Sequence, residues 1–228
     1  MYSQHYYFGR VKNAFIILLF YSLPIFSQKE YGYDEIKKNS VRIEFLNLSN
    51  ESLIEIPLLV QNCHNLKKLK LNNNRLTFLP DWLENLKNLE ELDISGNRTL
   101  NINQAFSIIS KLPNLKKLAA NHCNMFYLPV DIRKINTLKE VSISDNNIKY
   151  LPPIFEYTFW EKLDLSYNCI DTLPSTLVFM NTLTSLDLSY TPAIQNKFRE
   201  RIIETAKKNK IPFQRHASSR STGTDTDA

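Results

Sequence analysis

The sequence predicts an α/β solenoid, a coiled chain whose short parallel strands form one sheet on one face. Three observations support this fold class. A similar segment recurs about every 23 residues, each copy opens with alternating apolar residues, and most copies close around a Leu-Pro step. Self-similarity with a period of about 20–50 residues is the signature of repeat architectures. The copies begin at residues 43, 66, 89, 115, 138, 160 and 183.

The second copy, "LKKLKLNNNRLTFLPDWLENLKN", shows how one repeat builds its part of the fold. The alternation of a strand directs Leu69 and Leu71 inward and leaves Lys70 outside. The segment 76–83 then carries leucines back across the core, and Pro80 prevents the strand from continuing. Because one coil cannot bury its leucines alone, the coils must stack about 4.8 Å apart.

The pattern shared by the copies is L-x-x-L-x-L-x-x-N/C-x-L, over roughly residues 41–192, with continuations such as "FLPDWL" and "TLPSTL". It resembles the leucine-rich repeat family, in its common short class. The resemblance implies a curved solenoid of about seven repeats, with the parallel sheet on its concave face and a helical or irregular convex side. It also implies a ladder of buried asparagines at the ninth place. A short amide can satisfy backbone groups inside a turn, which favours a scaffold function over glycan or metal binding. The ninth place holds Asn74, Asn97, Cys123, Asn146 and Asn168.

The N-terminus resembles a secretory signal peptide over residues 1–27. Arg10 and Lys12 precede the apolar run "AFIILLFYSLPIF", whose 13 residues fall short of the roughly 20 that a membrane span needs. We expect cleavage between Ser27 and Gln28, and the ending "LPIFSQ" resembles signals of Bacteroidetes-type bacteria. The alternatives are an uncleaved anchor or an apolar N-terminal strand.

Both ends of the repeat region, residues 43–192, are expected to be capped, because a solenoid exposes its core at each end. Residues 28–42 are expected to form an N-terminal cap, with a short helix that carries Ile36 toward the first repeat. Residues 193–213 place apolar side chains at fourfold spacing, which predicts a C-terminal capping helix. A basic amphipathic helix could instead bind a membrane or a partner protein. Residues 214–228 are expected to form a disordered tail.

Composition argues against catalysis. With four glycines, the sequence has no P-loop or dinucleotide-binding motif, and it also has no zinc-protease or C-x-x-C motif. No cofactor and no metal site are predicted. Cys63, Cys123 and Cys169 are expected to be free and mostly buried, because Cys123 and Cys169 would lie about 10 Å apart, beyond the roughly 7 Å limit for a disulfide. Three free thiols are unusual in an exported protein, so a cytoplasmic location stays open.

The third repeat is longer than the others. Its 26 residues include extra chain near "RTLNINQAFSIIS", with Asn101 and Asn103 at the edge. Insertions of this kind often map to loops that tune binding, whereas drift in repeat length is the alternative.

Candidate binding residues are the outward positions of the concave strands, where the resemblance implies that partners dock. Near the C-terminal end, Tyr167 and Tyr190 flank Asp164 and Asp187 on adjacent strands, which suits a protein or peptide that carries Lys or Arg. A second, basic group comprises Lys68, Lys70 and Lys117. Either group could be an ordinary solvated face. The predicted ligand-binding residues are Lys70, Asp93, Asn121, His122, Asp164, Tyr167, Asp187 and Tyr190.

These features predict a non-enzymatic secreted module that presents its concave face to a protein or peptide ligand. The alternatives are an intracellular scaffold or regulator of a signalling protein, and an effector subunit of a separate enzyme. Loss of Arg10 and Lys12 with the signal would lower the formal charge from +5 to +3, spread along the chain, which argues against nucleic acid. We expect a monomer that is secreted, periplasmic or at the cell surface, without stable membrane insertion after cleavage.

Overall fold

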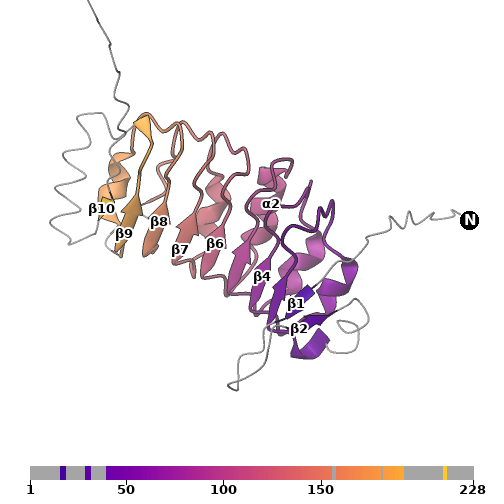
Figure 1. Ribbon diagram of the computed structural model, residues 1–228. Coiled ribbons are helices and arrows are strands. Elements are labelled where there is room, and N and C mark those ends of the chain that lie inside the picture. The colour runs from indigo at the N-terminus through magenta and orange to yellow at the C-terminus, as the bar shows by residue number, and fades with distance from the viewer. Residues whose placement is uncertain are drawn as a thin grey trace, which may run out of the picture.

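The chain forms a coil of stacked turns with the strands aligned along one side (Figure 1). The computed structural model describes residues 40–192 except 156, 157 and 181, together with the backbone of 16–18, 29–31 and 213–214. Seven parallel strands, one for each repeat, lie side by side in one sheet, which confirms the predicted solenoid. They are β3 (Phe45–Asn47), β4 (Lys68–Lys70), β5 (Glu91–Asp93), β6 (Lys117–Ala119), β7 (Glu140–Ser142), β8 (Lys162–Asp164) and β9 (Ser185–Asp187).

The strands pair in register, so that equivalent places of successive repeats are neighbours. Leu69 of β4 is the partner of Leu92 in β5, and this column continues through the middle residue of every strand. These middle residues are buried, because strand alternation directs them away from the concave face. One continuous apolar core therefore runs the length of the coil.

The chain returns on the convex side through short 3-10 helices. Four of them begin directly after a proline, whose extended backbone ends the preceding segment. A repeat of about 23 residues leaves room for little more than one such turn between strands. The 3-10 helices are η1 (Ser40–Arg42), η2 (Leu58–Asn62), η3 (Asp81–Asn85), η4 (Val130–Lys134) and η6 (Ser175–Phe179).

The extra chain of the third repeat forms an α-helix, α2 (Ile102–Ile109), on the convex side (Figure 1). Asn101 caps it by accepting a hydrogen bond from the Gln104 backbone N–H at 3.2 Å. The helix buries Phe106 completely against the core. The Gln104 side chain bonds both backbone groups of Leu79, at 3.0 and 2.6 Å. The insertion thus packs against the scaffold on the side opposite the concave sheet.

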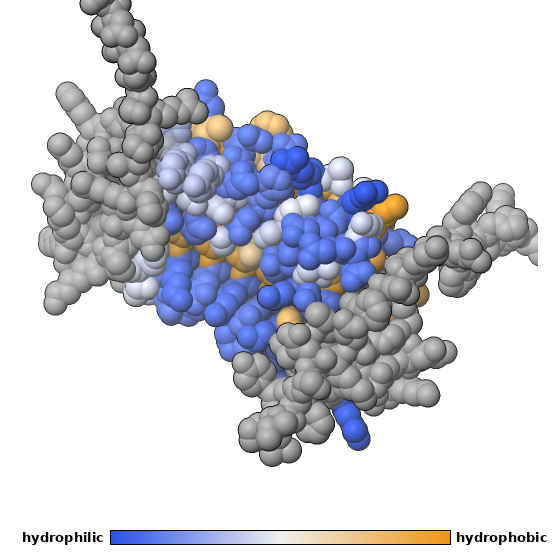
Figure 2. Space-filling model, viewed as in Figure 1, coloured by the Kyte–Doolittle hydropathy of each residue, from blue (hydrophilic) through white to orange (hydrophobic). Residues whose placement is uncertain are grey.

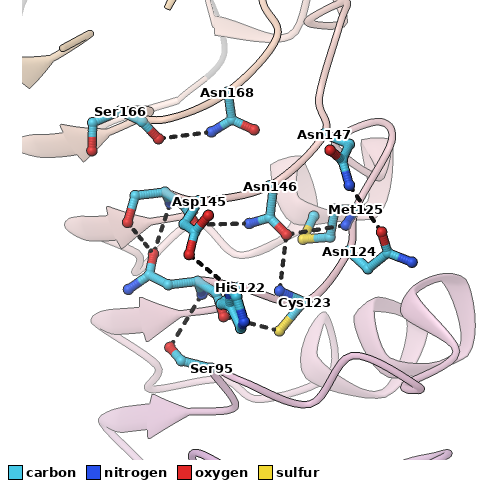
Figure 3. A network of polar contacts seen from close by, with 12 residues as sticks. Ser95, His122, Cys123, Asn124, Met125, Asp145, Asn146, Asn147, Ser166 and Asn168 are labelled. Carbon is cyan, nitrogen blue, oxygen red and sulfur yellow. Dashed lines mark hydrogen bonds and ion pairs between the residues drawn. The ribbon is translucent and has the colours of Figure 1, made fainter. Parts of the chain in front are cut away.

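The asparagines of the ninth place form the predicted ladder between repeats. In the middle of the coil, Asn146 accepts hydrogen bonds from the backbone N–H groups of Cys123 and Met125, both at 3.0 Å (Figure 3). Its amide also donates to the carbonyl oxygens of Ala120 and Ile143, both at 3.0 Å. Each ladder asparagine is buried and bridges its own repeat to the preceding one. The scaffold interpretation of these residues is confirmed.

Cysteine placement agrees with the prediction at two positions and differs at the third. All three thiols are free, and Cys63 and Cys123 are buried, but Cys169 is exposed. Cys123 fills the ninth place, where its thiol donates to the Ile94 carbonyl oxygen at 3.3 Å. Cys169 follows Asn168 at the tenth place, which faces solvent. Burial raises the pKa of both Cys63 and Cys123 to about 11, which leaves these two thiols protonated at neutral pH.

Strands outside the repeats extend the sheet at both ends. β1 (Ile16–Leu18) lies within the apolar run of the expected signal and pairs antiparallel with β3 and with β2 (Lys29–Tyr31). Residues 29–31 are therefore extended where a helical cap was expected, and Ile36 lies outside the described residues. β10 (Phe213–Gln214) pairs parallel with β9, so Gln214 belongs to the sheet and not to a disordered tail. Phe213, the last residue of the helix expected over 193–213, is extended in β10. The remainder of that helix and the tail from 215 lie outside the described residues, and signal cleavage stays a prediction.

Candidate functional site

The third places of the strands form a ladder of alternating charges across the concave face. Lys68 lies 2.9 Å from Glu91, and the chain of ion pairs continues through Lys117 and Glu140 to Lys162, with N–O distances of 3.9, 3.3 and 3.0 Å. Burial alone would raise the pKa of Glu140, but hydrogen bonds from Lys162 and Lys117 outweigh it and lower that pKa. Lys68 and Lys117 are thus paired with carboxylates, and the predicted basic group is reduced to Lys70.

Lys70 and Asp93 lie opposite each other on neighbouring strands, near the N-terminal end of the sheet. Lys70 is exposed, with its Nζ 6.0 Å from the centre of the Phe45 ring. Asp93 accepts a hydrogen bond from the Ser95 backbone N–H at 2.9 Å. One exposed cation thus lies opposite a carboxylate that also closes its own turn.

Asp164 and Asp187 are direct register partners on β8 and β9. Asp164 accepts from the backbone N–H and hydroxyl of Ser166, at 3.0 and 2.7 Å, and Asp187 accepts from the Ser189 N–H at 2.8 Å. In the first repeat, the Asn47 side chain makes the same bond to the Ser49 N–H with no charge. The turn therefore needs a side-chain oxygen but not a negative charge. Asp164 and Asp187, as like charges placed opposite each other, also repel.

Asn121 has a structural function in this surface. Its side-chain oxygen accepts from the hydroxyls of Ser142 and Ser144 and from the Ser144 N–H, at 2.8, 3.0 and 2.7 Å. In the fourth repeat Ala119 has no side-chain oxygen at the fifth place, and the Asn121 N–H donates to the Ser95 hydroxyl at 3.1 Å instead. In the fifth repeat the Ser142 hydroxyl donates to Asn121 and Asp164, and the oxygen of the half-buried Asn121 accepts the Ser144 N–H that a fifth-place aspartate accepts elsewhere.

The eighth places form the edge where the strands end, and all seven have a left-handed backbone. Their φ angles run from 52° to 73°, a region that suits Gly, Asn and Asp. Tyrosines in this conformation are unusual, and Tyr167 and Tyr190 occupy it in adjacent repeats. We name this row the eighth-place edge; it comprises Asn50, Asn73, Gly96, His122, Asp145, Tyr167 and Tyr190.

Tyr167 and Tyr190 stack on each other, with ring centres 4.3 Å apart and planes inclined by 19°. About half of each residue is exposed, 54% and 45% respectively. Desolvation raises the pKa of Tyr167, as do the contact with Tyr190 and the charges of Asp187 and Asp145. The stacked rings thus lie in the negative field of the nearby carboxylates. We call Asp164, Tyr167, Asp187 and Tyr190 the tyrosine–aspartate patch; its two rings stack, and its two aspartates are register partners on adjacent strands.

His122 lies next along the same edge and contacts Asp145, with His122 Nδ1 2.5 Å from Asp145 Oδ2 (Figure 3). Its side chain is half-buried, at 42% exposure, and that of Asp145 is exposed, at 63%. A polar hollow of about 340 Å³ lies between Arg98, these two residues and the neighbouring asparagines. Asp145 was absent from the predicted ligand-binding residues. The signal that could have identified it is its place in the same column as His122 and Tyr167.

A broad groove of about 450 Å³ runs over the strands from Lys68 to Asp187 and is lined by Lys70, Asp93, Asp164 and Asp187 among others. The face seen in Figure 2 is mostly hydrophilic, with apolar residues visible between the polar ones. In the part of the chain that the structure describes, no cluster of three His, Cys, Asp or Glu side chains could hold a metal ion. No helix among the described residues combines the length and apolarity that a membrane crossing requires.

Similarity to known proteins agrees with this architecture. The family described as Leucine Rich repeats (2 copies) matches residues 64–106, whereas no curated protein matches the sequence. A leucine-rich repeat protein of Leptospira interrogans has a similar structure, with a TM-score of 0.59 and 28% identity, over 70% of this chain and 46% of that chain. Internalin C2 of Listeria monocytogenes shares the fold at a TM-score of 0.55 and 20% identity, over 68% of this chain and 65% of that chain.

A third similar structure is a chain of the Toll–Spätzle complex of Drosophila, with a TM-score of 0.52 and 26% identity, over 58% of this chain and 18% of that chain. The chain spans less than two thirds of the length of each of these three proteins. The repeated pattern, the seven parallel strands and these similarities identify the chain as a leucine-rich repeat protein.

Proposed function

We propose that this chain is a non-enzymatic protein-binding module that is exported and holds a protein or peptide ligand on its concave face. The observation that carries the proposal is the tyrosine–aspartate patch. Two bulky rings occupy backbone positions that favour Asn or Gly, beside two carboxylates that the turns do not need as charges. Residues that break a local rule mark a surface with a task other than folding.

The patch has the properties of a binding hot spot. Tyrosine supplies a large contact area with few rotatable bonds, and it is enriched at such sites. The stacked pair is already arranged before a ligand arrives, so little conformational entropy would be lost on binding. Leucine-rich repeat proteins are generally scaffolds for protein interaction, and the Toll–Spätzle complex is itself an assembly of a similar chain.

Export is supported by the apolar run with its basic flank at the N-terminus. The free thiols favour the alternative of an intracellular scaffold, although the two buried ones stay protonated and unreactive in either compartment. The intact mass and compartment of the protein in its native cell distinguish the two. A mass that begins at Gln28 outside the cytoplasm supports export, whereas a full-length mass in the cytoplasm contradicts it and favours the scaffold.

The concave binding site can be tested without knowing the ligand, through peptides selected from a displayed random library on the purified chain. Their affinities are then measured on two matched double variants, each of which removes two exposed aromatic residues. Tyr167→Ser with Tyr190→Ser alters the concave edge, and Phe126→Ser with Tyr150→Ser alters the flank. We expect the selected peptides to lose affinity only for the first variant. Equal affinities for both variants would contradict the concave site.

A further inference from the structure

We propose that the tyrosine–aspartate patch recognises an arginine side chain of the ligand, in preference to lysine. The guanidinium plane stacks on a ring face of the tyrosine pair, and its N–H groups are directed at Asp164 and Asp187. This inference rests on the proposed function, because it specifies the chemistry of the ligand on the same concave surface.

The first step is the charge balance of the concave face. At the third places, every glutamate of the ladder has a lysine within 4 Å, and the flanking pairs Lys67–Glu44, Lys116–Glu90 and Lys139–Glu161 follow the same rule. Among the described residues, no ion pair involves Asp164 or Asp187; serine groups supply the hydrogen bonds that these two carboxylates accept. A cation from outside the chain would supply at this patch the pairing that the third-place ladder makes internally.

The second step is the geometry of the acceptors. One oxygen of each carboxylate is held by the N–H two residues later, which fixes the orientation of the group. The other oxygen of Asp164 accepts only the Ser142 hydroxyl, at 3.1 Å, among the described residues. Neighbouring parallel strands lie about 4.8 Å apart, so the two groups offer a pair of oxygens that one forked donor can span. The acceptors are therefore fixed in place before binding.

The third step separates arginine from lysine. A guanidinium is planar, stacks on aromatic faces and donates in a rigid fork, whereas an ammonium is a compact and strongly hydrated point charge. The stacked rings of Tyr167 and Tyr190 supply the flat surface, and Asp145 adds a third carboxylate near Tyr167. Lysine can use the charge of this site, but it cannot use the ring faces and the paired oxygens together.

The test uses three short acetylated and amidated peptides that differ at one central position, which is arginine, lysine or citrulline. Citrulline keeps the planar shape of arginine without its charge. Binding to the full chain is followed by NMR titration. We expect the arginine peptide to bind about tenfold more tightly than the lysine peptide, and the citrulline peptide to bind at least about tenfold more weakly than arginine.

Two matched variants localise the effect. Asp187→Asn should weaken arginine binding about tenfold, because it removes a charge while Asn keeps the turn, as Asn47 does in the first repeat. Asp81→Asn makes the same change on the convex side, at the start of η3, and it should leave the affinity unchanged. Circular dichroism confirms that both variants are folded.

Equal affinities for the arginine and lysine peptides would overturn the inference, and so would equal losses in the two variants. Selected library peptides that need Tyr167 and Tyr190 but contain no basic residue would overturn it as well, while leaving the proposed function standing. Peptides that ignore the concave variant altogether would instead contradict the proposed function.

Discussion

The two halves of the eighth-place edge share one backbone conformation and differ in how well their residues suit it. In the N-terminal half, Asn50, Asn73 and Gly96 are residues that favour positive φ, and Asn73 donates to the Asn50 side chain at 3.0 Å. In the C-terminal half, Tyr167 and Tyr190 adopt the same angles. Because repeat geometry is common to both halves, the coil does not require the tyrosines. The difference separates residues that serve the fold from residues that serve the surface.

The ninth place, one residue further along the chain, shows no such division. Asn74 and Asn97 in the N-terminal half make the same kinds of bond to the preceding repeat as Asn146 and Asn168 do in the C-terminal half. These buried amides satisfy backbone groups that have no access to water. The two halves thus diverge at the exposed edge and not inside the turn.

Asn146→Ala should produce the largest effect, because it removes interior bonds that both halves need. It leaves the N–H groups of Cys123 and Met125 and at least one carbonyl without a partner in a buried turn. At about 1–3 kcal/mol for each unsatisfied group, we expect a loss of about 3–5 kcal/mol in the free energy of unfolding, measured by urea denaturation. The exposed neighbour Asn147→Ala is the control and should stay within about 0.5 kcal/mol. A loss for Asn146→Ala no larger than that of the control would contradict the ladder.

Gly96→Ala should destabilise the N-terminal half by about 2 kcal/mol, from a left-handed penalty of about 1–2 kcal/mol and the disturbance of Asn73. A Cβ at Gly96 would lie 2.3 Å from the Asn73 side-chain oxygen, so that this side chain must move. In an Asn73→Ala background the substitution should cost less, although the Asn73 backbone N remains 3.0 Å away. Chemical denaturation of the four proteins of this cycle measures the coupling, and strict additivity would exclude the contact.

The double variant Tyr167→Asn with Tyr190→Asn should raise the stability of the fold, unlike the two preceding substitutions. The change removes the backbone strain of two tyrosines at positive φ, about 1 kcal/mol each. It also removes the stacking of the two rings, which contributes about 0.5–1.5 kcal/mol. We expect a gain of about 1 kcal/mol, seen as a rise in Tm of about 2–4 °C, together with loss of ligand binding. The reverse change in the N-terminal half, Asn73→Tyr, should lower the Tm. A double variant that is less stable than the wild type would show that the tyrosines serve the fold after all.

Much of the fold could be predicted because two periods in the sequence act together: the alternation of residues within each strand and the length of the repeat. Alternation in each strand buries Leu69 and Leu92, and the repeat length places them side by side, so the columns of the concave face follow from the sequence. The interior position of Asn74 follows in the same way, since a turn of this kind needs a short amide. Gln214 could not be placed, because a strand of two residues that pairs with β9 has no periodic pattern in the sequence.

Two features of the site are visible when equivalent positions of the repeats are compared in the sequence, but they were recognised only in the structure. The order Lys68, Glu91, Lys117 alternates in sign, and cross-strand neighbours of opposite charge pair, so the lysines were never a free basic group. The eighth place combines Asn, Gly and Asp, which is the composition of a left-handed position. That composition would have identified Tyr167 and Tyr190 as the exceptions.

The smallest expected effects concern Glu140, in the middle of the sheet, and Glu51, in the first repeat, whose contributions to stability should respond to pH in opposite ways. Hydrogen bonds and charges of Lys162 and Lys117 outweigh burial and lower the pKa of Glu140 below its ordinary 4.5, so its ionised form stabilises the fold. This contribution is complete above about pH 4.5 and is lost as the pH falls through the lower folded-state value. Glu140→Gln should therefore cost a few tenths of a kcal/mol at pH 7, and the difference from the wild type should vanish in acid.

Glu51 occupies the ninth place of the first repeat, where most other repeats have asparagine, and burial raises its pKa above 4.5. Its protonated form favours the fold, and that contribution is lost as the pH rises through the folded-state value. Glu51→Gln should therefore be slightly more stable than the wild type at pH 7 and equal to it at low pH, the reverse of Glu140→Gln. Urea denaturation of both variants from pH 3 to 7 measures the two signs. If both variants changed the stability at pH 7 in the same direction, burial of Glu51 and pairing of Glu140 would not have the opposite effects that are expected here.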